Sequence, residues 1–423
     1  MNLPELLGWI STVLGLLIGA CYAYQIVYLF APLVVKKRLY GPAKPNRYAV
    51  LIAARNEEQV LPHLLQSIQD QDYPSVMVTT YVVADNCTDR TAEVARACGA
   101  KVFSRFNREK VGKGYALNYL LEKIRLTDGL DKYDAFLIFD ADNLLEPDYI
   151  TNINRVCSDG YDAFCGYRNS KNFQTNWVSA GQSLWYLHDS SHLNRSRMLL
   201  GNPCAVTGTG FGFTRSLLEQ MGGWNFFALT EDIEFSTWCA TRGIRVGYCH
   251  DAVLYDEQPD RFSVSWRQRT RWVQGGIQVS VRCAGDLFRG LLKGGRIGYA
   301  SLETATLSLW GYCAASLSGL LSLIVRYLEA GWPGVAYGVL CALLVSYWGL
   351  LLMGFMTLVM EWHRIRATDG QKVGALFTFP VFMMAYVPIG ISAFFRKFQW
   401  LPIEHTHALS ARELQSTLPD KKN

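Results

Sequence analysis

Long apolar stretches lie at both ends of the chain and are absent from its middle. Residues 8–35 carry no charged side chain, and a helix of that length is long enough to cross the ~30 Å hydrocarbon core of a bilayer. Apolar runs return over residues 304–325, 335–360 and 374–395. No comparable run occurs between residue 47 and about residue 293. The pattern therefore predicts a water-soluble domain enclosed between membrane-spanning segments.

Charges that flank the first run predict its orientation. Glu5 is the charged residue before it, and the basic residues 36–38 follow it directly. The positive-inside rule then places the N-terminus outside and the chain after residue 38 in the cytosol. A secretory signal would instead begin with a basic segment and have a shorter apolar core. A buried core helix is the alternative, but so long a stretch without a charge favours a membrane span.

The number of crossings at the C-terminal end stays open. The loop over residues 361–372 is basic, which suits the cytosolic side. If the run over residues 374–395 also crosses, the basic residues 396–397 lie outside, against the same rule. Pro380 and Pro388 interrupt that run, and a re-entrant hairpin packed against protein is a competing interpretation. We expect three or four crossings.

The central domain alternates between strand-like and helical patterns. Strand-like runs cover residues 48–54, 77–84, 100–103 and 135–139, and helical patterns cover residues 57–68, 88–98 and 114–124. Strands and helices in alternation predict an α/β fold with a doubly wound, mostly parallel sheet. Polar clusters follow three of these strands, at residues 55–57, 85–86 and 140–142. Ligands bind at the carboxyl ends of such strands, so these clusters are candidate site residues.

Composition narrows the functional classes. Half of the 423 residues are hydrophobic and 18% are charged, which excludes a disordered chain. A net charge of +5 without a basic stripe argues against a nucleic-acid partner. The eleven cysteines form no CxxC pairs, so they indicate neither a zinc module nor a disulfide framework, and they fit a reducing compartment.

These patterns divide the chain into five parts. We expect an N-terminal transmembrane helix over residues 1–38 and a cytosolic domain over residues 39–285. An interfacial linker over residues 286–303 leads to a transmembrane region of two or three spans over residues 304–395. Residues 396–423 form the C-terminal tail.

Acidic and basic residues at the strand ends suggest chemistry. Asp140 and Asp142 flank one residue after a strand, and two carboxylates with phosphate oxygens and water suit Mg²⁺ or Mn²⁺. A helix cap or solvated turn would explain the same pair. Lys113 could neutralise a diphosphate or lie on the surface as an ordinary lysine. Asp85 could bind a base or ribose, or cap a turn.

Two later segments suggest transfer chemistry. Thr230-Glu231-Asp232 precedes a helical pattern, so its carboxylates could supply a general base or complement the helix dipole. Gln268, Arg271 and Trp272 share one helical face. Arginine can bind a leaving diphosphate and tryptophan can stack on a sugar ring. The alternative for this face is an interfacial amphipathic helix with a tryptophan anchor.

The order of these segments carries a resemblance. The array reads Ala54-Arg55-Asn56-Glu57, Asp85 to Asp89, Lys113 to Asn118, Asp140-Ala141-Asp142, Thr230-Glu231-Asp232 and Gln268 to Trp272. It resembles the membrane-embedded family 2 glycosyltransferases, inverting GT-A enzymes that include cellulose, chitin, hyaluronan and poly-N-acetylglucosamine synthases. The resemblance covers about residues 47–276. Residues 400–406 also resemble a tail element of some members, without an assigned role.

The resemblance implies three groups of site residues. The nucleotide-binding residues are Ala54, Arg55, Glu57, Asp85, Lys113, Asp140, Gln268 and Trp272. The metal-binding pair is Asp140 and Asp142, for Mg²⁺ or Mn²⁺. The catalytic residues are Glu231, Asp232 and Arg271, with Asp232 as the base. An inverting transfer needs this division, a base on the acceptor side and cations on the diphosphate side.

The resemblance also implies an activity and its setting. We expect transfer from a UDP-sugar, with glucose or N-acetylglucosamine, to a β-linked glycan at the cytosolic face of the plasma membrane. Because three or four spans are few for a chain that conducts its own polymer, a homo-oligomer, a small membrane subunit or a short product is expected. The alternative acceptor is a membrane lipid of the diacylglycerol type. A transporter or inactive scaffold is a third interpretation, but it has no need of base, metal ligands and cation together.

Overall fold

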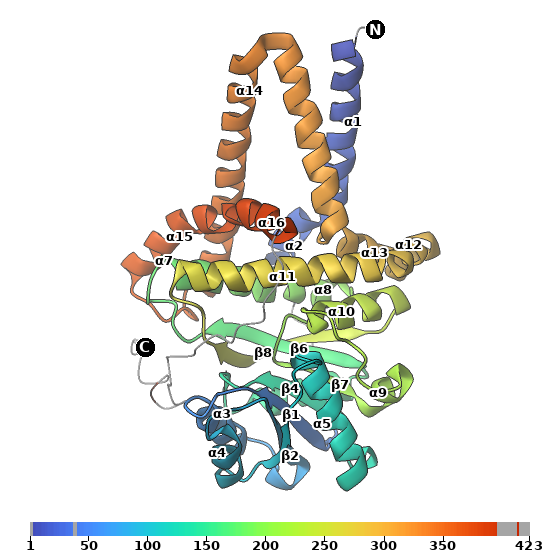
Figure 1. The fold of residues 1–423 in the computed structure, drawn as a ribbon, viewed down its shortest axis with the longest axis vertical. Helices are drawn as coiled ribbons and strands as arrows, with labels where there is room; N and C mark the ends of the chain where they lie inside the picture. The colour runs from blue at the N-terminus through green and yellow to red at the C-terminus, as the bar shows by residue number, and fades with distance from the viewer. Residues whose placement is uncertain (1–2, 37–39, 396–412, 414–423) are drawn as a thin grey trace.

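The computed structural model describes residues 3–36, 40–395 and 413. Residues 37–39 and, apart from residue 413, the expected tail over residues 396–423 lie outside the described residues. The centre of the fold is an eight-stranded sheet with the strand order β3-β2-β1-β4-β7-β6-β8-β5. Helices surround this sheet, and the apolar helices α1 (Leu3–Tyr22) and α14 (Leu309–Glu361) extend away from it (Figure 1).

The first half of the sheet is parallel, as predicted. It consists of β1 (Tyr48–Ala54), β2 (Val78–Asp85), β3 (Lys101–Arg105) and β4 (Ala135–Asp140). β1 pairs in parallel with β2 and β4, and β2 pairs in parallel with β3. Strands β1 and β4 are buried almost throughout, which explains why they read as continuous apolar runs.

The second half of the sheet is mixed, and its strands were not predicted. It consists of β5 (Leu144–Leu145), β6 (Ala163–Ser170), β7 (Phe211–Thr214) and β8 (Val246–Asp256). β7 is antiparallel to both β4 and β6, β6 is parallel to β8, and β5 is antiparallel to β8. The parallel half therefore continues into a mixed half through β7.

Helices of the soluble part connect these strands. They are α3 (Leu61–Gln69), α4 (Thr91–Ala97), α5 (Lys113–Thr127), α6 (Tyr149–Ser158), α9 (Arg215–Met221) and α10 (Glu231–Arg242). α5 packs on β1 and β2, and α4 packs on β3. The helical patterns expected over residues 57–68, 88–98 and 114–124 correspond to α3, α4 and α5.

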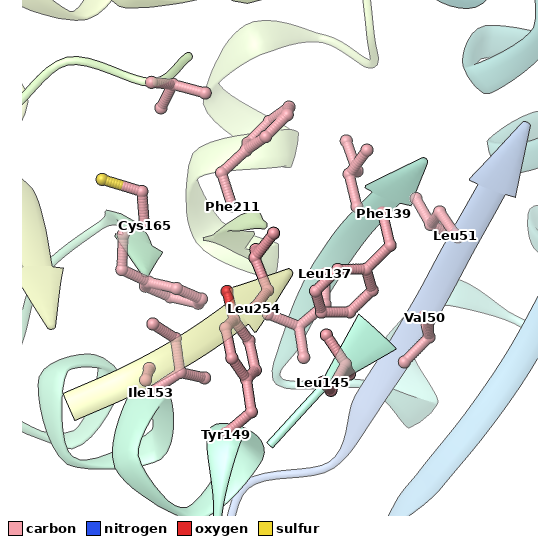
Figure 2. Packing of buried hydrophobic residues seen from close by; sticks show 14 of the residues in the cluster. Val50, Leu51, Leu137, Phe139, Leu145, Tyr149, Ile153, Cys165, Phe211 and Leu254 are labelled. Carbon is pink, nitrogen blue, oxygen red and sulfur yellow. The ribbon is translucent and has the colours of Figure 1, made fainter. Parts of the chain in front are cut away.

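Side chains from both halves of the sheet pack into one core. Figure 2 shows residues of β1, β4, β5, β8 and α6 converging around Tyr149 and Leu254. The Tyr149 hydroxyl donates a hydrogen bond to the Gly210 carbonyl oxygen at 2.8 Å. Gly210 has a φ of 63°, which a residue with a side chain rarely adopts. This buried contact fixes the loop before β7, which reaches the candidate site.

Three helices are long and apolar enough to cross a membrane, over residues 4–34, 309–361 and 369–395 of the described chain. The first contains α1 (Leu3–Tyr22) and α2 (Tyr24–Val34). The second is α14 (Leu309–Glu361), which breaks at Gly331, where φ is 63° and ψ is −155°. This break turns α14 into a hairpin whose two arms extend beside α1, away from the sheet (Figure 1).

The third apolar stretch lies differently from the other two. It is divided into α15 (Asp369–Met384) and α16 (Tyr386–Phe395). Both helices run across the base of the α14 hairpin rather than alongside its arms (Figure 1). More of this stretch is buried, 28% against 0% and 6% for the other two candidates. Whether this run crosses a membrane or re-enters it stays a prediction.

The remaining helices lie between the sheet and the α14 hairpin. They are α7 (Trp177–His188), α8 (Arg195–Leu200), α11 (Phe262–Arg282), α12 (Ala284–Lys293) and α13 (Gly295–Thr306), with a π-helical turn (Asp189–Asn194) joining α7 and α8. α11 crosses this layer from end to end (Figure 1). It contacts α10 on one side and α16 on another. It therefore joins the soluble domain to the helices at the base of the apolar arms, which we call the membrane-level helices: α13, α15, α16 and the start of α14.

Candidate active site

One cavity of about 720 Å³ lies between the carboxyl ends of the strands and the membrane-level helices. The predicted site residues that line it are Arg55, Glu57, Lys113, Asp140, Asp142, Glu231, Asp232, Gln268, Arg271 and Trp272. They come from segments more than two hundred residues apart in the chain. The structure thus brings the separate acidic, basic and aromatic clusters to the same cavity.

Lys113 joins the two acidic clusters. Its Nζ donates to Oδ1 of Asp140 at 2.5 Å and to the Gly208 carbonyl oxygen at 2.7 Å. Oε1 of Glu231 lies 3.9 Å from the same nitrogen. Burial lowers the pKa of Lys113, but the carboxylates of Asp140 and Glu231 outweigh it, and the net pKa is raised. The lysine is therefore a fixed positive charge between the strand end and α10.

The two carboxylates at the end of β4, those of Asp140 and Asp142, differ in their exposure. The Asp140 side chain is 36% exposed, and its backbone N–H donates to Thr209 Oγ1 at 2.9 Å. Asp142 is 4% exposed, and its Oδ2 accepts from the Glu257 backbone N–H at 3.2 Å. Both residues line the cavity, but Asp140 is the more exposed of the two, and Asp142 also anchors the end of β8.

The donor set of this pair suits a metal that binds together with a ligand. Among residues 3–36, 40–395 and 413, no group of three or more His, Cys, Asp or Glu side chains could hold a metal ion. Asp140 and Asp142 supply carboxylate oxygens, and the cavity leaves room for further oxygen donors. This set fits Mg²⁺ or Mn²⁺, which commonly complete their coordination with phosphate oxygens and water.

Glu231 and Asp232 begin α10 at the cavity wall. Burial raises the pKa of Glu231 to about 7, against the opposing effect of Lys113. Burial also raises the pKa of Asp232, which the Ile233 backbone N–H opposes. Gly208 comes close to this carboxylate, since a Cβ at Gly208 would lie 3.9 Å from Asp232 Oδ2. A carboxylate with a raised pKa beside a cation is typical of a general base site.

α11 supplies the opposite wall of the cavity. Gln268, Arg271 and Trp272 lie on its cavity-facing side, as their helical spacing predicts. The Trp272 ring packs edge-on against Tyr186, with centroids 6.2 Å apart. On another side of the helix, the buried guanidinium of Arg269 donates to the Phe382 carbonyl oxygen at 2.9 Å. α11 is thus fixed by α15 while it presents its polar face to the cavity.

Several cavity residues were not predicted. They are Arg168, Tyr186, Asp189, Arg197, Asp256 and Glu303. Arg168 stacks on the Tyr186 ring at 3.7 Å and forms an ion pair with Asp256, whose pKa is raised to about 6 by burial although Arg168 opposes it. Asp256 ends β8, so the rule that favoured the other strand ends could have identified it, had β8 been recognised.

A second buried ion pair lies at the membrane side of the cavity. Arg197 on α8 contacts Oε1 of Glu303 on α13 at 2.7 Å, and both side chains are at most 6% exposed. The Tyr28 hydroxyl on α2 donates to the other Glu303 carboxylate oxygen at 3.2 Å. This pair connects the N-terminal membrane helix to the cavity wall, and no local sequence pattern indicates it.

Two predicted nucleotide residues do not line the cavity. Ala54 is 1% exposed within β1. The Asp85 carboxylate accepts from Nη1 of Arg105 at 2.5 Å and from Nδ2 of Asn86 at 3.2 Å. Both residues lie at the carboxyl ends of their strands.

Comparison with known proteins identifies a family and several relatives that this chain resembles. Residues 45–275 match the family model described as "Glycosyltransferase like family 2". A probable glycosyltransferase YdaM of Bacillus subtilis (strain 168) is 24% identical over 363 residues, which cover 80% of this chain and 79% of that protein.

Two relatives with named activities match over a shorter region. A beta-monoglucosyldiacylglycerol synthase of Synechocystis sp. (strain ATCC 27184 / PCC 6803 / Kazusa) is 27% identical over 54% of this chain and 47% of that protein. A poly-beta-1,6-N-acetyl-D-glucosamine synthase of Staphylococcus epidermidis is 26% identical over 55% of each chain. The matched region therefore spans about half the length of these two synthases.

A solved structure shares the fold. The mannosyltransferase PcManGT from Pyrobaculum calidifontis, in complex with GDP-Man and Mn²⁺, has a TM-score of 0.56 and 19% sequence identity, and the match covers 91% of this chain and 99% of that chain. The similarity identifies the architecture as that of GT-A glycosyltransferases.

Proposed function

Because the chain belongs to the glycosyltransferase-like family 2, we propose that it transfers a sugar from a UDP-sugar to an acceptor hydroxyl with inversion at the anomeric carbon. The single observation that carries this proposal is the arrangement of charges in one cavity. A carboxylate pair begins α10, while Lys113 and Arg271 approach the same cavity from α5 and α11. One cavity is thus lined by two adjacent carboxylates and two cationic side chains.

This arrangement supports a single in-line displacement. Asp232 accepts the proton of the acceptor hydroxyl while that oxygen forms the new bond to the anomeric carbon. The bond from this carbon to the diphosphate oxygen breaks, and the diphosphate leaves with the electron pair. Lys113 and Arg271 are placed to stabilise the leaving charge. Glu231 lies nearer to Lys113, at 3.9 Å, and we assign it the role of holding this lysine.

The donor diphosphate is proposed to bind beside the ion pair of Lys113 and Asp140, on its cavity side. A Mg²⁺ or Mn²⁺ ion held by Asp140 and Asp142 would supply further positive charge to the diphosphate. The Mn²⁺ in the complex of the mannosyltransferase PcManGT supports this assignment. Arg55 and Glu57 line the nucleotide end, and Ala54 and Asp85 are proposed to support it from behind. The UDP specificity, with glucose or N-acetylglucosamine, rests on the resemblance of the motif array.

The acceptor is proposed to approach from the membrane side. The cavity reaches Leu307, Tyr312 and Tyr386, which belong to the membrane-level segments. A growing β-linked glycan at the cytosolic face of the plasma membrane is the first candidate. The apolar character of this end favours a second candidate, the hydroxyl of a membrane lipid. For the glycan, a homo-oligomer or a small membrane subunit would complete a path across the bilayer.

A substitution at the base tests the reaction. Asp232→Asn should lower the transfer rate about 10²–10⁴-fold, the usual contribution of a general base, while UDP binding is retained. Asp72→Asn is the matched control, because Asp72 is exposed and does not line the cavity. Transfer at the unaltered rate by Asp232→Asn would disprove the assignment of the base.

Product analysis separates the two acceptors. Purified protein in lipid vesicles is incubated with each of a panel of labelled UDP-sugars, and the products are separated by thin-layer chromatography. A ladder of glycans supports the polymer, whereas one sugar per lipid supports the lipid acceptor. Failure of every UDP-sugar, with turnover of another nucleotide sugar, would overturn the donor assignment.

A further inference from the structure

The short helix α12 presents apolar side chains to the outside. On α12 and the last turn of α11, the exposed apolar residues are Val281, Phe288, Leu291 and Leu292, with exposed fractions of 61%, 62%, 37% and 73%. The opposite side of α12 is buried, at Leu287 and Gly290. A helix that buries one side and exposes large apolar residues on another needs a partner for the exposed side.

Basic residues lie close in the sequence to these apolar side chains, and one of them, Arg289, pairs with Asp286 at 2.7 Å. Residues 281–296 contain four basic residues and one acidic residue, Asp286, which gives a net charge of +3. Arg289, Lys293 and Arg296 are all exposed. We call the exposed residues of this stretch the α12 patch: Val281, Phe288, Arg289, Leu291, Leu292, Lys293 and Arg296. Apolar residues within a basic border are typical of helices that lie on an anionic membrane surface.

The location of the α12 patch indicates which partner it meets. α12 and α13 lie at the base of α1 and α14, where these apolar helices leave the soluble domain (Figure 1). α13 ends at Thr306, and the membrane-spanning candidate begins at Leu309. If α1 and α14 are inserted, the α12 patch lies at the height of the lipid headgroups. Its positive charge complements anionic phospholipids.

The inner side of the α12–α13 pair forms part of the cavity wall. Leu287 of α12 and Ala300 of α13 line the cavity wall. α13 also contacts the end of α10, since a Cβ at Gly243 would lie 3.1 Å from Ile297, and Asp286 pairs with Arg242 at 3.3 Å. α10 begins with the two carboxylates. Movement of the α12–α13 pair would therefore disturb both the cavity and the helix that carries the proposed base.

We propose that the α12 patch binds anionic phospholipid headgroups of the adjoining leaflet, and that this contact holds the α12–α13 wall of the cavity in place. Arg289, Lys293 and Arg296 bind the phosphate groups, while Phe288 and Leu292 enter the boundary of the acyl chains. The catalytic consequence rests on the proposed function; the lipid contact does not. Transfer activity should therefore depend on the anionic fraction of the bilayer.

The test uses the full chain in nanodiscs of phosphatidylcholine alone or mixed with phosphatidylglycerol. Amide hydrogen exchange of α12 reports the contact, and the sugar transfer rate reports its consequence. The charge variant is Arg289→Gln/Lys293→Gln/Arg296→Gln. The matched control is Arg96→Gln/Arg125→Gln/Lys132→Gln, three exposed residues that belong neither to the α12 patch nor to the cavity lining. A further variant, Phe288→Ser/Leu292→Ser, removes the apolar contact.

Phosphatidylglycerol should slow exchange in α12 and raise the transfer rate of the unmodified chain. Each basic residue near an anionic leaflet strengthens association about fivefold, so the charge variant should weaken the contact about 100-fold and lose the lipid response. The control should keep it, high salt should suppress it, and Phe288→Ser/Leu292→Ser should speed exchange in both lipids.

Two results would overturn the proposal. One is exchange in α12 that is the same in both lipids, and the other is a charge variant that keeps the full response. An equal loss in the control would show a general effect of net charge and would also refute the assignment to the α12 patch. If the chain transfers no sugar, α12 exchange still decides the lipid contact. If exchange is unresponsive while transfer proceeds, the lipid contact alone fails.

Discussion

A tight contact between α11 and the start of α10 allows a precise test of the site. Gly275 of α11 faces Thr230, the residue directly before the two carboxylates. A Cβ at Gly275 would lie 2.5 Å from Thr230 Oγ1, 2.6 Å from Cγ2 and 2.9 Å from the backbone nitrogen. Gly275→Ala adds only this methyl group to a buried position, and it touches neither the carboxylates nor the cations.

The size of the displacement follows from these distances. Ordinary contact begins at 3.4 Å, so the Thr230 backbone nitrogen, at 2.9 Å, must move away by about 0.5 Å. Rotation of the Thr230 side chain cannot relieve this contact. A misplacement of about 1 Å at a catalytic group can lower the rate ~10²-fold, so half of that distance predicts about tenfold. Overpacking should also destabilise the fold by about 1–3 kcal/mol.

Initial rates of sugar transfer and thermal unfolding followed by tryptophan fluorescence measure these two effects. Gly374→Ala on α15 is the control, because its methyl group would meet no atom within 4 Å. This control should keep its rate and gain up to ~1 kcal/mol from the better helix propensity of alanine. Gly275→Ala with an unchanged rate and unchanged unfolding would refute the close packing of α11 on the start of α10.

Further predictions concern pH, metal and the second ion pair. A base works only when ionised, and burial raises the pKa of Asp232 above the 3.8 typical of aspartate. Transfer should therefore fall with decreasing pH before pH 3.8 is reached, and an acid limb of kcat/KM at or below pH 3.8 would contradict this. Full chelation by EDTA should abolish transfer and added Mn²⁺ or Mg²⁺ should restore it, whereas activity that survives chelation would remove Asp142 from a metal-binding role. Either Arg197→Met or Glu303→Gln leaves a buried group without its partner and should destabilise the fold by about 3–5 kcal/mol. In thermal unfolding, the double variant should recover much of this loss of stability. A double variant that shows the full sum of the two losses would mean that the pair does not interact.

The parallel half of the sheet could be predicted because its central strands, β1 and β4, are buried almost throughout. β1, for example, is an uninterrupted apolar run that corresponds to the predicted range, residues 48–54. The strands of the other half escaped prediction for local reasons. β5 has two residues and β7 has four, and β6 includes polar residues that face the cavity, such as Arg168. Such segments resemble loops until their partners are known.

Residues of the candidate site could be named, but their contacts could not. Lys113 was expected near a diphosphate, whereas its ion pair with Asp140 depends on how α5 meets β4. Asp85 was expected to contact a nucleotide, and nothing near it in the sequence indicates that its carboxylate pairs with Arg105, twenty residues later. The ion pair of Arg197 and Glu303 joins helices 106 residues apart.

The amino-acid sequence by itself determined the apolar segments, the alternation of strands and helices, and the residue types that the chemistry requires. These features depend on periodicity and burial within a short window, which neighbouring residues encode directly. The tertiary structure alone decided that α15 and α16 lie across the base of α14, and that α10 and α11 enclose one cavity with the strand ends. Those outcomes depend on which surfaces pack together over hundreds of residues, and no local pattern contains that information.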